Sequence, residues 1–312
     1  MFGLNNPQSP ILIIFVVVII AAYNFHTINA VLQYEPPSVN IVDKVKTGRV
    51  AMVYPTMKGG DEWFMGPNLQ NDKRFEANAN LSRNQDSSWS VNSTGQTTLN
   101  IWTNGSGDFR QQEEMDTYNH SIIEARGYWY KPSDWKNVEM MGYFKLNDYV
   151  DDEYSTNSRS IWHNRTHNGC GGSDYKLKLH FDGSVTFDKE EWHVHYSDQP
   201  KPEWLPEHKI IDGLGNLTNK WIGLKSVVYN MEQNGTSYPK MEMWIDQNNN
   251  NTWKMIHEYA DKGGWGSSMN RCGGAPDQLI KWGSPVVTFR WDDNANVDFR
   301  NLSVREIQPP QH

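Results

Sequence analysis

The 312-residue chain has little basic charge and no repeating pattern. It carries 29 Lys and Arg against 37 Asp and Glu, which gives a formal net charge of −8. A general nucleic-acid-binding protein needs a basic surface for the phosphates, so this class is excluded. No collagen or coiled-coil period and no low-complexity bias occurs, which excludes fibrous and compositionally disordered proteins.

Long helical stretches and long apolar runs are also scarce. Only residues 112–124 form a weak helical candidate, and the one continuous apolar run is ILIIFVVVIIAA at 11–22. That run is shorter than the roughly 20 residues needed to span a bilayer, and its length is typical of a signal-peptide core. Ala30 ends a candidate cleavage site, although no Lys or Arg precedes the run. We expect residues 1–30 to direct export to the cell surface or beyond, as a cleaved signal peptide or as an uncleaved membrane anchor.

Two further features agree with export. Cys170 and Cys272 make an even count, so we expect them to form a disulfide, with two free buried thiols as the alternative. The bridge would close a loop of about 100 residues, worth up to about 4.7 kcal/mol by loop entropy. N-glycosylation sequons of the form Asn-x-Ser/Thr begin at Asn80, Asn92, Asn104, Asn119, Asn164, Asn216, Asn234, Asn250 and Asn301.

Aromatic residues, by contrast, are abundant, with 14 Trp and 14 Tyr. From Asp61 onward, short aromatic and β-branched runs alternate with Gly, Asn and Asp, which is typical of strands separated by turns. The pairs 182–183 (Asp-Gly) and 234–235 (Asn-Gly) predict tight hairpins. Without alternating helices, this pattern predicts an all-β fold, an antiparallel β-sandwich or jelly roll. We expect one such domain at 59–308, a tether with a first strand (RVAMVY, 49–54) at 31–58, and a tail at 309–312.

Period-two alternation assigns two faces to each strand. In YKLKLHF (175–181) the residues Tyr175, Leu177 and Leu179 share a core face, and Met241, Met243 and Ile245 do so in a later strand. The opposite, polar faces present Lys176, Lys178 and His180; Glu191, His193 and His195; and Glu242, Trp244 and Asp246. An ordinary solvated surface explains each strand alone, whereas three such strands together favour a binding concavity.

These aromatic strands, the segment YKLKLHFDGSVTFDKEEWHVHY (175–196) and the terminal strand VDFRNLSVREI (297–307) resemble the concanavalin A-like lectin/glucanase superfamily. In particular they resemble its β-jelly-roll polysaccharide lyases and related secreted carbohydrate-binding proteins, over roughly residues 50–307. The resemblance implies a polysaccharide or cell-surface glycan as partner, with Arg, His and Tyr on a concave face. We expect contact with a membrane only through the N-terminal segment.

Glycan binding is the leading hypothesis, and cleavage of a uronate-containing polymer by β-elimination is the sharper alternative. A lyase needs cations to neutralise the uronate carboxylate and a base to remove the neighbouring proton. Residues 155–180 contain two Arg and two Lys against Asp174, formally +3, and such a basic strip suits an anionic ligand. The candidate catalytic residues are Arg159, His163, Arg165, His180, His193 and Tyr196. The candidate ligand-binding residues are His167, Lys176, Lys178, Glu191, His195, Glu242 and Trp244.

Two further classes compete with these. Glucanases of this fold carry an E-x-D-x-E strand, which is missing here; Glu242 and Asp246 lie about 13 Å apart at 3.3 Å per residue, too far for paired catalytic carboxyls. A structural cell-surface glycoprotein is the remaining alternative.

One loop has the alternating oxygen ligands of a calcium site, with Asp246, Asn248 and Asn250 as candidate ligands. It lacks the EF-hand glycine, because Asn251 occupies the sixth place, so an Asn-rich hairpin turn is the alternative. The resemblance adds Asp298, near the terminal strand, as a ligand of a structural Ca²⁺. Zinc is disfavoured because the paired histidines have no evident third ligand.

Overall fold

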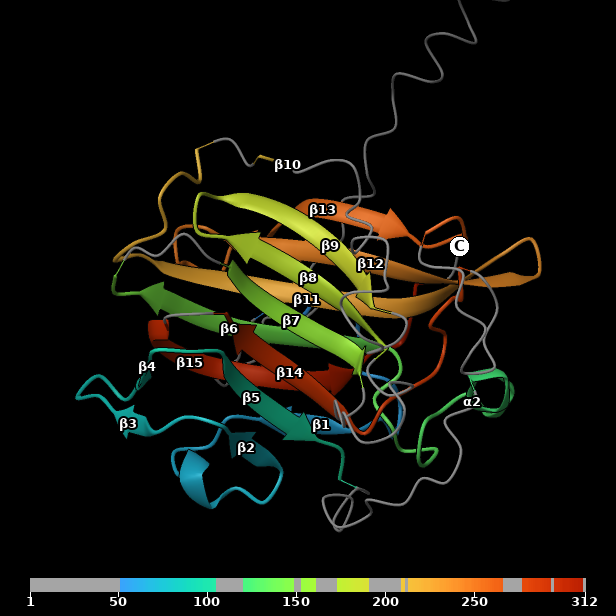
Figure 1. Ribbon diagram of the computed structural model, residues 1–312, viewed down its shortest axis with the longest axis horizontal. Helices are drawn as coiled ribbons and strands as arrows, with labels where there is room; N and C mark the ends of the chain where they lie inside the picture. Colours follow the sequence, from blue (N-terminus) through green and yellow to red (C-terminus); the bar gives the residue numbers. More distant parts are fainter. Residues whose placement is uncertain are drawn as a thin grey trace, which may run out of the picture. The chain divides into compact units, whose positions relative to one another are not determined.

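The computed structural model describes residues 51–104, 120–148, 153–160, 173–190, 209–210, 213–265, 277–292 and 295–310. Strands dominate these residues, and all of them fall within one compact unit, Val45–His312. The strands form two sheets in which every pairing is antiparallel, as predicted for a β-sandwich (Figure 1). Two short helical segments occur among the described residues, η1 (Leu69–Asn71) and α2 (His120–Arg126), the latter overlapping the predicted helix at 112–124.

The first sheet has seven strands and faces the viewer in Figure 1. Its order is β10 (Lys209–Ile210), β9 (Ser184–Glu190), β8 (Asp174–His180), β7 (Glu153–Ser160), β14 (Val286–Trp291), β5 (Thr97–Trp102) and β2 (Phe75–Ala77).

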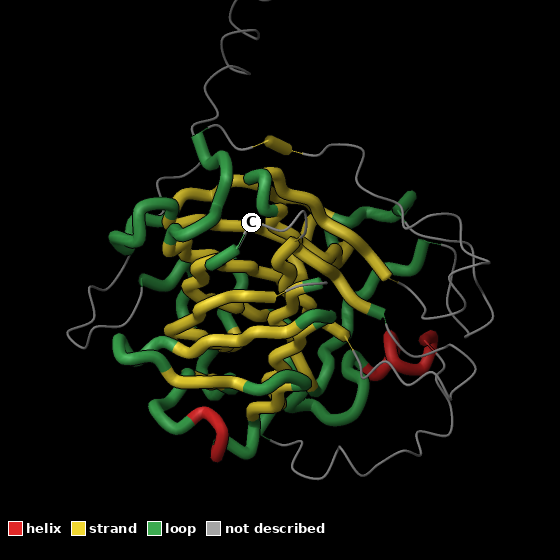
Figure 2. Tube along the Cα trace, turned by 60° about the vertical axis from the view of Figure 1, so that its left-hand side comes forward, coloured by secondary structure: helices red, strands yellow, loops and turns green. Residues whose placement is uncertain are grey.

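The second sheet has eight strands. Its order is β13 (Lys254–Ala260), β12 (Thr236–Asp246), β11 (Trp221–Gln233), β6 (Val138–Leu146), β15 (Ala295–Glu306), β4 (Trp89–Ser93) and β3 (Leu81–Arg83), and β1 (Glu62–Phe64) also pairs with β15. In Figure 2 the strands run through the middle of the molecule and the helical segments lie at its periphery.

The hydrophobic core contains inward-facing side chains of both sheets, as the period-two pattern predicts. Tyr175, Leu177 and Leu179 of β8 are buried in it, and so are Met241 and Met243 of β12. The neighbouring positions on each strand therefore point away from the core. Both face assignments are confirmed, and with them the direction in which the polar side chains project.

Both predicted hairpins are also confirmed. Asn234 and Gly235 have positive φ angles of 53° and 74°, and they link Gln233 to Thr236 in the register of β11 and β12. Two consecutive left-handed residues are what a tight hairpin turn with matching strand twist requires. Gly183, with φ 90°, ends the turn between β8 and β9, and Asp182 accepts a hydrogen bond from the backbone N–H of Ser184.

The predicted first strand at 49–54 differs from the structure, since residues 51–54 belong to no strand. These residues instead cross the outward side of the eight-stranded sheet and are held by its side chains. The backbone N–H of Val53 donates to Glu139, and the hydroxyl of Tyr54 donates to Glu242. Residues 51–57 form one isolated β-bridge, in which Thr56 pairs with Ile307. A chain segment whose hydrogen bonds go to carboxylates does not need to extend a sheet.

The N-terminal apolar run, Cys170 and Cys272 lie outside the described residues. Among the residues that are described, no helix has the length and apolar character needed to cross a membrane.

Candidate functional site

Polar side chains cover the outward side of the seven-stranded sheet. We call this surface the polar face; it comprises Asn100, Glu153, Ser155, Asn157, Asp174, Lys176, Lys178, His180, Thr186, Asp188, Glu190, Thr288 and Arg290, together with Asp292, which pairs with Arg290 directly after β14. They come from five neighbouring strands: β5, β14, β7, β8 and β9.

Strand register aligns these side chains in rows. Ser155 lies opposite Arg290 on one side and Lys178 on the other, and Lys178 lies opposite Thr186. The next row joins Thr288, Asn157, Lys176 and Asp188 in the same way. Side chains directly opposite each other on adjacent strands are close enough to interact, so each row places polar side chains next to one another.

Two carboxylates hold each lysine of the polar face. The ammonium of Lys178 lies 2.6 Å from Glu153 and 2.7 Å from Asp188. That of Lys176 lies 2.5 Å from Glu190 and 3.8 Å from Asp174. Burial alone would lower the pKa of Lys178, but Asp188 and Glu153 outweigh it and raise that pKa above its ordinary value.

Neutral groups complete the network. The hydroxyl of Thr288 donates to the Asn100 side chain at 2.8 Å, and the amide of Asn157 donates to Asp174 at 2.9 Å. The His180 ring contacts the Thr186 hydroxyl at 2.9 Å. The donors and acceptors of this face are therefore fixed in position by their neighbours.

Exposure separates the polar face from an ordinary solvated sheet surface. Asn157 is 3% exposed, Asp188 6% and Lys178 8%, although all three point away from the core. Charged side chains on a plain solvent face are usually exposed. Here they pack side by side as a dense polar layer.

The charge of the polar face is opposite to the sequence-based expectation. The ion-paired cations are Lys176, Lys178 and Arg290, and their partners are Glu153, Asp174, Asp188, Glu190 and Asp292. Three cations against five carboxylates give a formal −2 with His180 neutral. Residues 155–180 are basic in the sequence, but the register places acidic side chains from outside that segment beside its lysines. The two lysines of the predicted basic strip are thus neutralised by carboxylates, whereas Arg165 of the same strip lies outside the described residues.

Arg159, a predicted catalytic residue, does not contribute its guanidinium to the polar face. Its side chain is fully buried and donates hydrogen bonds to the backbone carbonyls of Lys136 and Ile280. Burial lowers its pKa to about 10. The guanidinium therefore ties two loops together inside the protein and is not accessible to a ligand.

Glu242 and Trp244, predicted to bind ligand, lie on the outward side of the eight-stranded sheet and so do not join the polar face. The Glu242 carboxylate is 3% exposed and accepts hydrogen bonds from Tyr54, Tyr229 and Trp244 at 2.9–3.0 Å. Burial raises the pKa of this carboxyl, and the three donors only partly oppose the rise. The group is enclosed by its own chain.

The predicted calcium ligands do not fit a calcium site. Both oxygens of the buried Asp246 already accept hydrogen bonds, from Tyr143 and from the backbone N–H groups of Asn250 and Asn251. Such bonds describe an Asn-rich turn, in which Asn248 is also exposed. Asp298 lies 2.6 Å from the ammonium of Lys145, so its charge is already balanced. Within the described ranges, no group of three or more His, Cys, Asp or Glu side chains could hold a metal.

The other predicted site residues lie outside the described residues: His163, Arg165, His167, Cys170, Glu191, His193, His195, Tyr196 and Cys272. Their roles remain predictions.

Most members of the polar face were missed from the sequence, although the signal was present. Thr186 and Asp188 alternate with buried Val185 and Phe187, just as Lys176 and Lys178 alternate with leucines. Extending the same period-two reading to β7, β9 and β14 would have found the missing residues.

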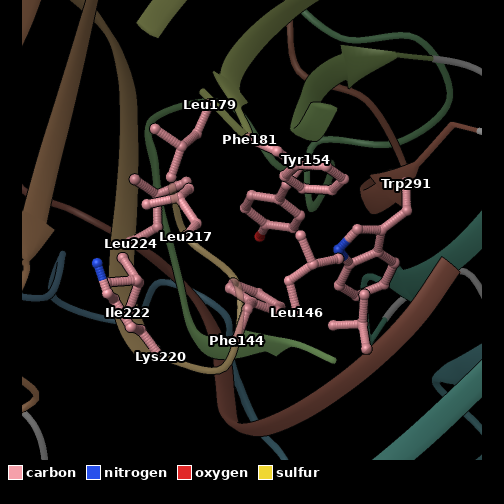
Figure 3. A pocket seen from close by; sticks show the side chains of 11 residues that line it. Phe144, Leu146, Tyr154, Leu179, Phe181, Leu217, Lys220, Ile222, Leu224 and Trp291 are labelled. Atoms are coloured by element: carbon pink, nitrogen blue, oxygen red, sulfur yellow. The ribbon is translucent and has the colours of Figure 1, made fainter. Parts of the chain in front are cut away.

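A small cavity lies inside the sandwich, between the two sheets (Figure 3). Its volume is about 30 Å³, and it is lined mainly by apolar side chains, among them Phe144, Leu179 and Trp291. The buried Tyr154 hydroxyl is among its few polar groups and has no hydrogen-bond partner within the described part of the chain. A space of this size holds a water molecule or two, not a sugar ring. The polar face is therefore the better candidate for a glycan.

No family model and no curated protein matches the chain. Solved structures with a similar arrangement of strands include carbohydrate-binding module CBM66 from Bacillus subtilis, at 11% identity and TM-score 0.38, covering 76% of this chain and 98% of that one. Alginate lyase Aly36B is similar at 10% identity and TM-score 0.41, covering 83% and 94%. The β-glucanase of Bacillus licheniformis is similar at 10% identity and TM-score 0.39, covering 81% and 100%. Identity at this level gives no residue-by-residue correspondence, so the function has to rest on this chain's own side chains.

Proposed function

We propose that this chain binds a polysaccharide through the polar face. The observation that carries the proposal is the set of hydrogen-bonded and ion-paired side chains that strand register aligns on five adjacent strands. Each sugar hydroxyl both donates and accepts hydrogen bonds, so a sugar needs both kinds of partner at close spacing. The side chains of Lys176, Glu190, His180 and Arg290 are 14–20% exposed beside the buried members of the network.

Preorganisation supports the same conclusion. A side chain that is already held by two neighbours loses little conformational freedom when a ligand arrives. Lys178 between Glu153 and Asp188 is such a group. Hydrogen bonds to charged groups are about twice as strong as neutral ones, so partly exposed charges add affinity for hydroxyls without requiring a charged ligand.

The charge balance favours a neutral, hydroxyl-rich polymer. A polyuronate would bring its own carboxylates toward a surface that carries five carboxylates against three cations. Like charges at short distance disfavour such a complex. Lyase chemistry also needs a cation available to the uronate, and Lys176 and Lys178 are already neutralised by two partners each.

The test is affinity electrophoresis of the full-length chain, in detergent if it retains the N-terminal segment. One set of gels would contain a neutral polymer, either a β-glucan, a mannan or a galactan. A second set would contain a polyuronate, either alginate or polygalacturonate. A reference protein would be run in every gel. We expect retardation by at least one neutral polymer and no ultraviolet absorbance from unsaturated products. Absence of retardation in every gel would overturn glycan binding. Rising absorbance on a uronate would establish the lyase alternative in its place.

A further inference from the structure

The sequon asparagines that the structure describes share two structural properties: each is exposed, and none donates a hydrogen bond through its side-chain nitrogen. We propose that they carry N-linked glycans and that these glycans leave the polar face bare. The sites are Asn80, Asn92, Asn104, Asn216, Asn234, Asn250 and Asn301. Glycosylation of these sites does not depend on polysaccharide binding, whereas the test of the bare polar face rests on the proposed function.

Accessibility is the first property. Every sequon asparagine that the structure describes is exposed. Asparagines outside sequons are mixed: Asn68 and Asn78 are exposed, Asn84 and Asn100 are half-buried, and Asn157 is buried. A glycan needs its asparagine at the surface, and a turn or an exposed strand position satisfies this requirement.

The state of the side-chain nitrogen is the second property. Glycosylation takes place at Nδ2, and none of the seven described sequon asparagines uses Nδ2 in a hydrogen bond. Where their side chains bond at all, as in Asn216 and Asn250, the oxygen accepts a backbone N–H two residues later and the nitrogen stays free. Outside sequons the state of this nitrogen varies. It donates a hydrogen bond in Asn78, Asn84, Asn147, Asn157, Asn230 and Asn296. It donates none in the exposed Asn68, Asn71, Asn219 and Asn248, which lack the motif.

The seven sequon asparagines lie in loops or on the eight-stranded sheet. Five of the sites lie in loops and turns that connect strands: Asn80, Asn104, Asn216, Asn234 and Asn250. The remaining two lie on strands of the eight-stranded sheet, Asn92 on β4 and Asn301 at the irregularity of β15. The described strands of the seven-stranded sheet contain no sequon, and their outward asparagines, Asn100 and Asn157, are occupied in the polar network.

Two sites have visible room for a sugar. Asn80 and Asn92 line one open hollow, together with Asn78, Ser93 and Thr94. A first sugar on either nitrogen would extend into this space without displacing a core side chain.

The chemistry needs a polyprenyl-diphosphate-linked oligosaccharide and the transferase that uses it during export. Nδ2 attacks C1 of the first sugar, and the new N–C1 bond replaces the bond between C1 and the diphosphate oxygen. Nδ2 loses one proton, and the polyprenyl diphosphate leaves. The Ser or Thr two residues later completes the recognised motif.

The experiment is site mapping on the full chain, expressed in a eukaryotic secretory host. The purified protein would be treated with peptide N-glycosidase in ¹⁸O-water, which converts each glycosylated Asn to labelled Asp, and then analysed by peptide mass spectrometry. We expect labelled Asp at most of the seven positions and a band that collapses to the polypeptide mass. Asn248→Gln should leave the pattern unchanged, whereas Asn250→Gln should remove one glycan.

Unlabelled asparagine at most of the seven positions would overturn the proposal. This holds whether the chain was not exported or was exported without being glycosylated. Equal retardation of treated and untreated protein on the polysaccharide gels would support the bare polar face. Binding that appears only after glycan removal would contradict that part.

Discussion

The outward sides of the two sheets carry the same kinds of charged and polar side chains, but these side chains have different partners on each sheet. On the eight-stranded sheet, Glu139 is buried and accepts hydrogen bonds from Arg305 and from the backbone of Val53, so residues 51–57 close over it. On the polar face the paired charges are only partly covered, with Lys176 16% and Glu190 14% exposed. Polar residues on one sheet therefore anchor the chain's own N-terminal segment, and on the other they pair with one another at the surface that we propose binds the ligand.

The aromatic residues follow the same division. On the eight-stranded sheet, cations already stack on the rings: the Arg300 guanidinium lies 4.2 Å from the Trp221 ring centre, and the Lys225 ammonium lies 4.4 Å from that of Trp253. Such stacking stabilises the cation when it is partly desolvated. Both tryptophan rings are thus engaged by cations of the protein itself.

The largest expected effect comes from breaking the network under the N-terminal segment. Glu139→Gln leaves the Arg305 and Lys225 charges buried without their carboxylate. Removing one partner of a buried pair costs about 3–5 kcal/mol, measured as the loss of unfolding free energy in urea. Glu190→Gln on the polar face is the matched control and should cost less than Glu139→Gln, because the side chains of its pair with Lys176 are 14–16% exposed. Equal losses in both variants would break the comparison.

A smaller change should appear in ligand binding. Lys176→Met removes a charged donor from the polar face, and we expect at least a tenfold weaker affinity, about 1.4 kcal/mol, for the polymer found by electrophoresis. Lys145→Met is the matched variant, because Lys145 also forms an ion pair and is partly exposed, but on the other sheet. Its affinity should not change. A reversed order of the two variants would place the ligand on the eight-stranded sheet.

Tyr54→Phe tests whether the hydrogen bonds to the buried Glu242 carboxylate stabilise the fold without affecting ligand binding. It removes one of three donors to Glu242 and one anchor of residues 51–57. We expect a loss of about 1 kcal/mol in unfolding free energy with polysaccharide affinity unchanged, measured on one protein preparation. Weaker polysaccharide binding in this variant would show that the two outward sides are not independent.

The smallest expected effect is in the pH dependence of stability. Burial alone would raise the pKa of Glu139, but Lys225, Arg305 and two hydrogen bonds outweigh it and lower that pKa. A depressed folded pKa contributes stability that is present above the unfolded value of about 4.3 and is lost as pH falls through the folded value. Glu139→Gln should therefore flatten the acid decline of the unfolding free energy, followed by urea titration from about pH 6 to 3.

Glu242 should behave with the opposite sign. Its pKa is raised by burial, so its contribution is present below the unfolded value and is lost as pH rises through the folded one. Glu242→Gln should steepen the net decline toward acid, where Glu139→Gln flattens it. The same slope change in both variants would contradict the assignment.

The strand faces and hairpins could be predicted from the sequence because they depend on neighbours within a few residues. Leu177 and Leu179 fix the direction of Lys176 and Lys178 by alternation alone. The charge of the polar face could not be predicted, because Glu153 and Asp188 reach Lys178 through strand pairing.

Distance along the chain explains the other differences. Tyr54 meets Glu242 across 188 residues, so no local pattern indicates that residues 51–54 use side-chain anchors instead of a strand ladder. Glu242 and Lys176 share the same period-two signature, yet they belong to different sheets whose outward sides point in opposite directions.

The most direct test of the polar face is chemical-shift mapping of backbone amides during titration with an oligosaccharide of the retained polymer. We predict that perturbed amides cluster on β7, β8, β9 and β14, around Asn157 and Lys178. Amides of β11 and β12 around Lys225 and Glu242 should stay unchanged. A cluster on β11 and β12 with an unperturbed β8 would contradict the assignment of the binding site.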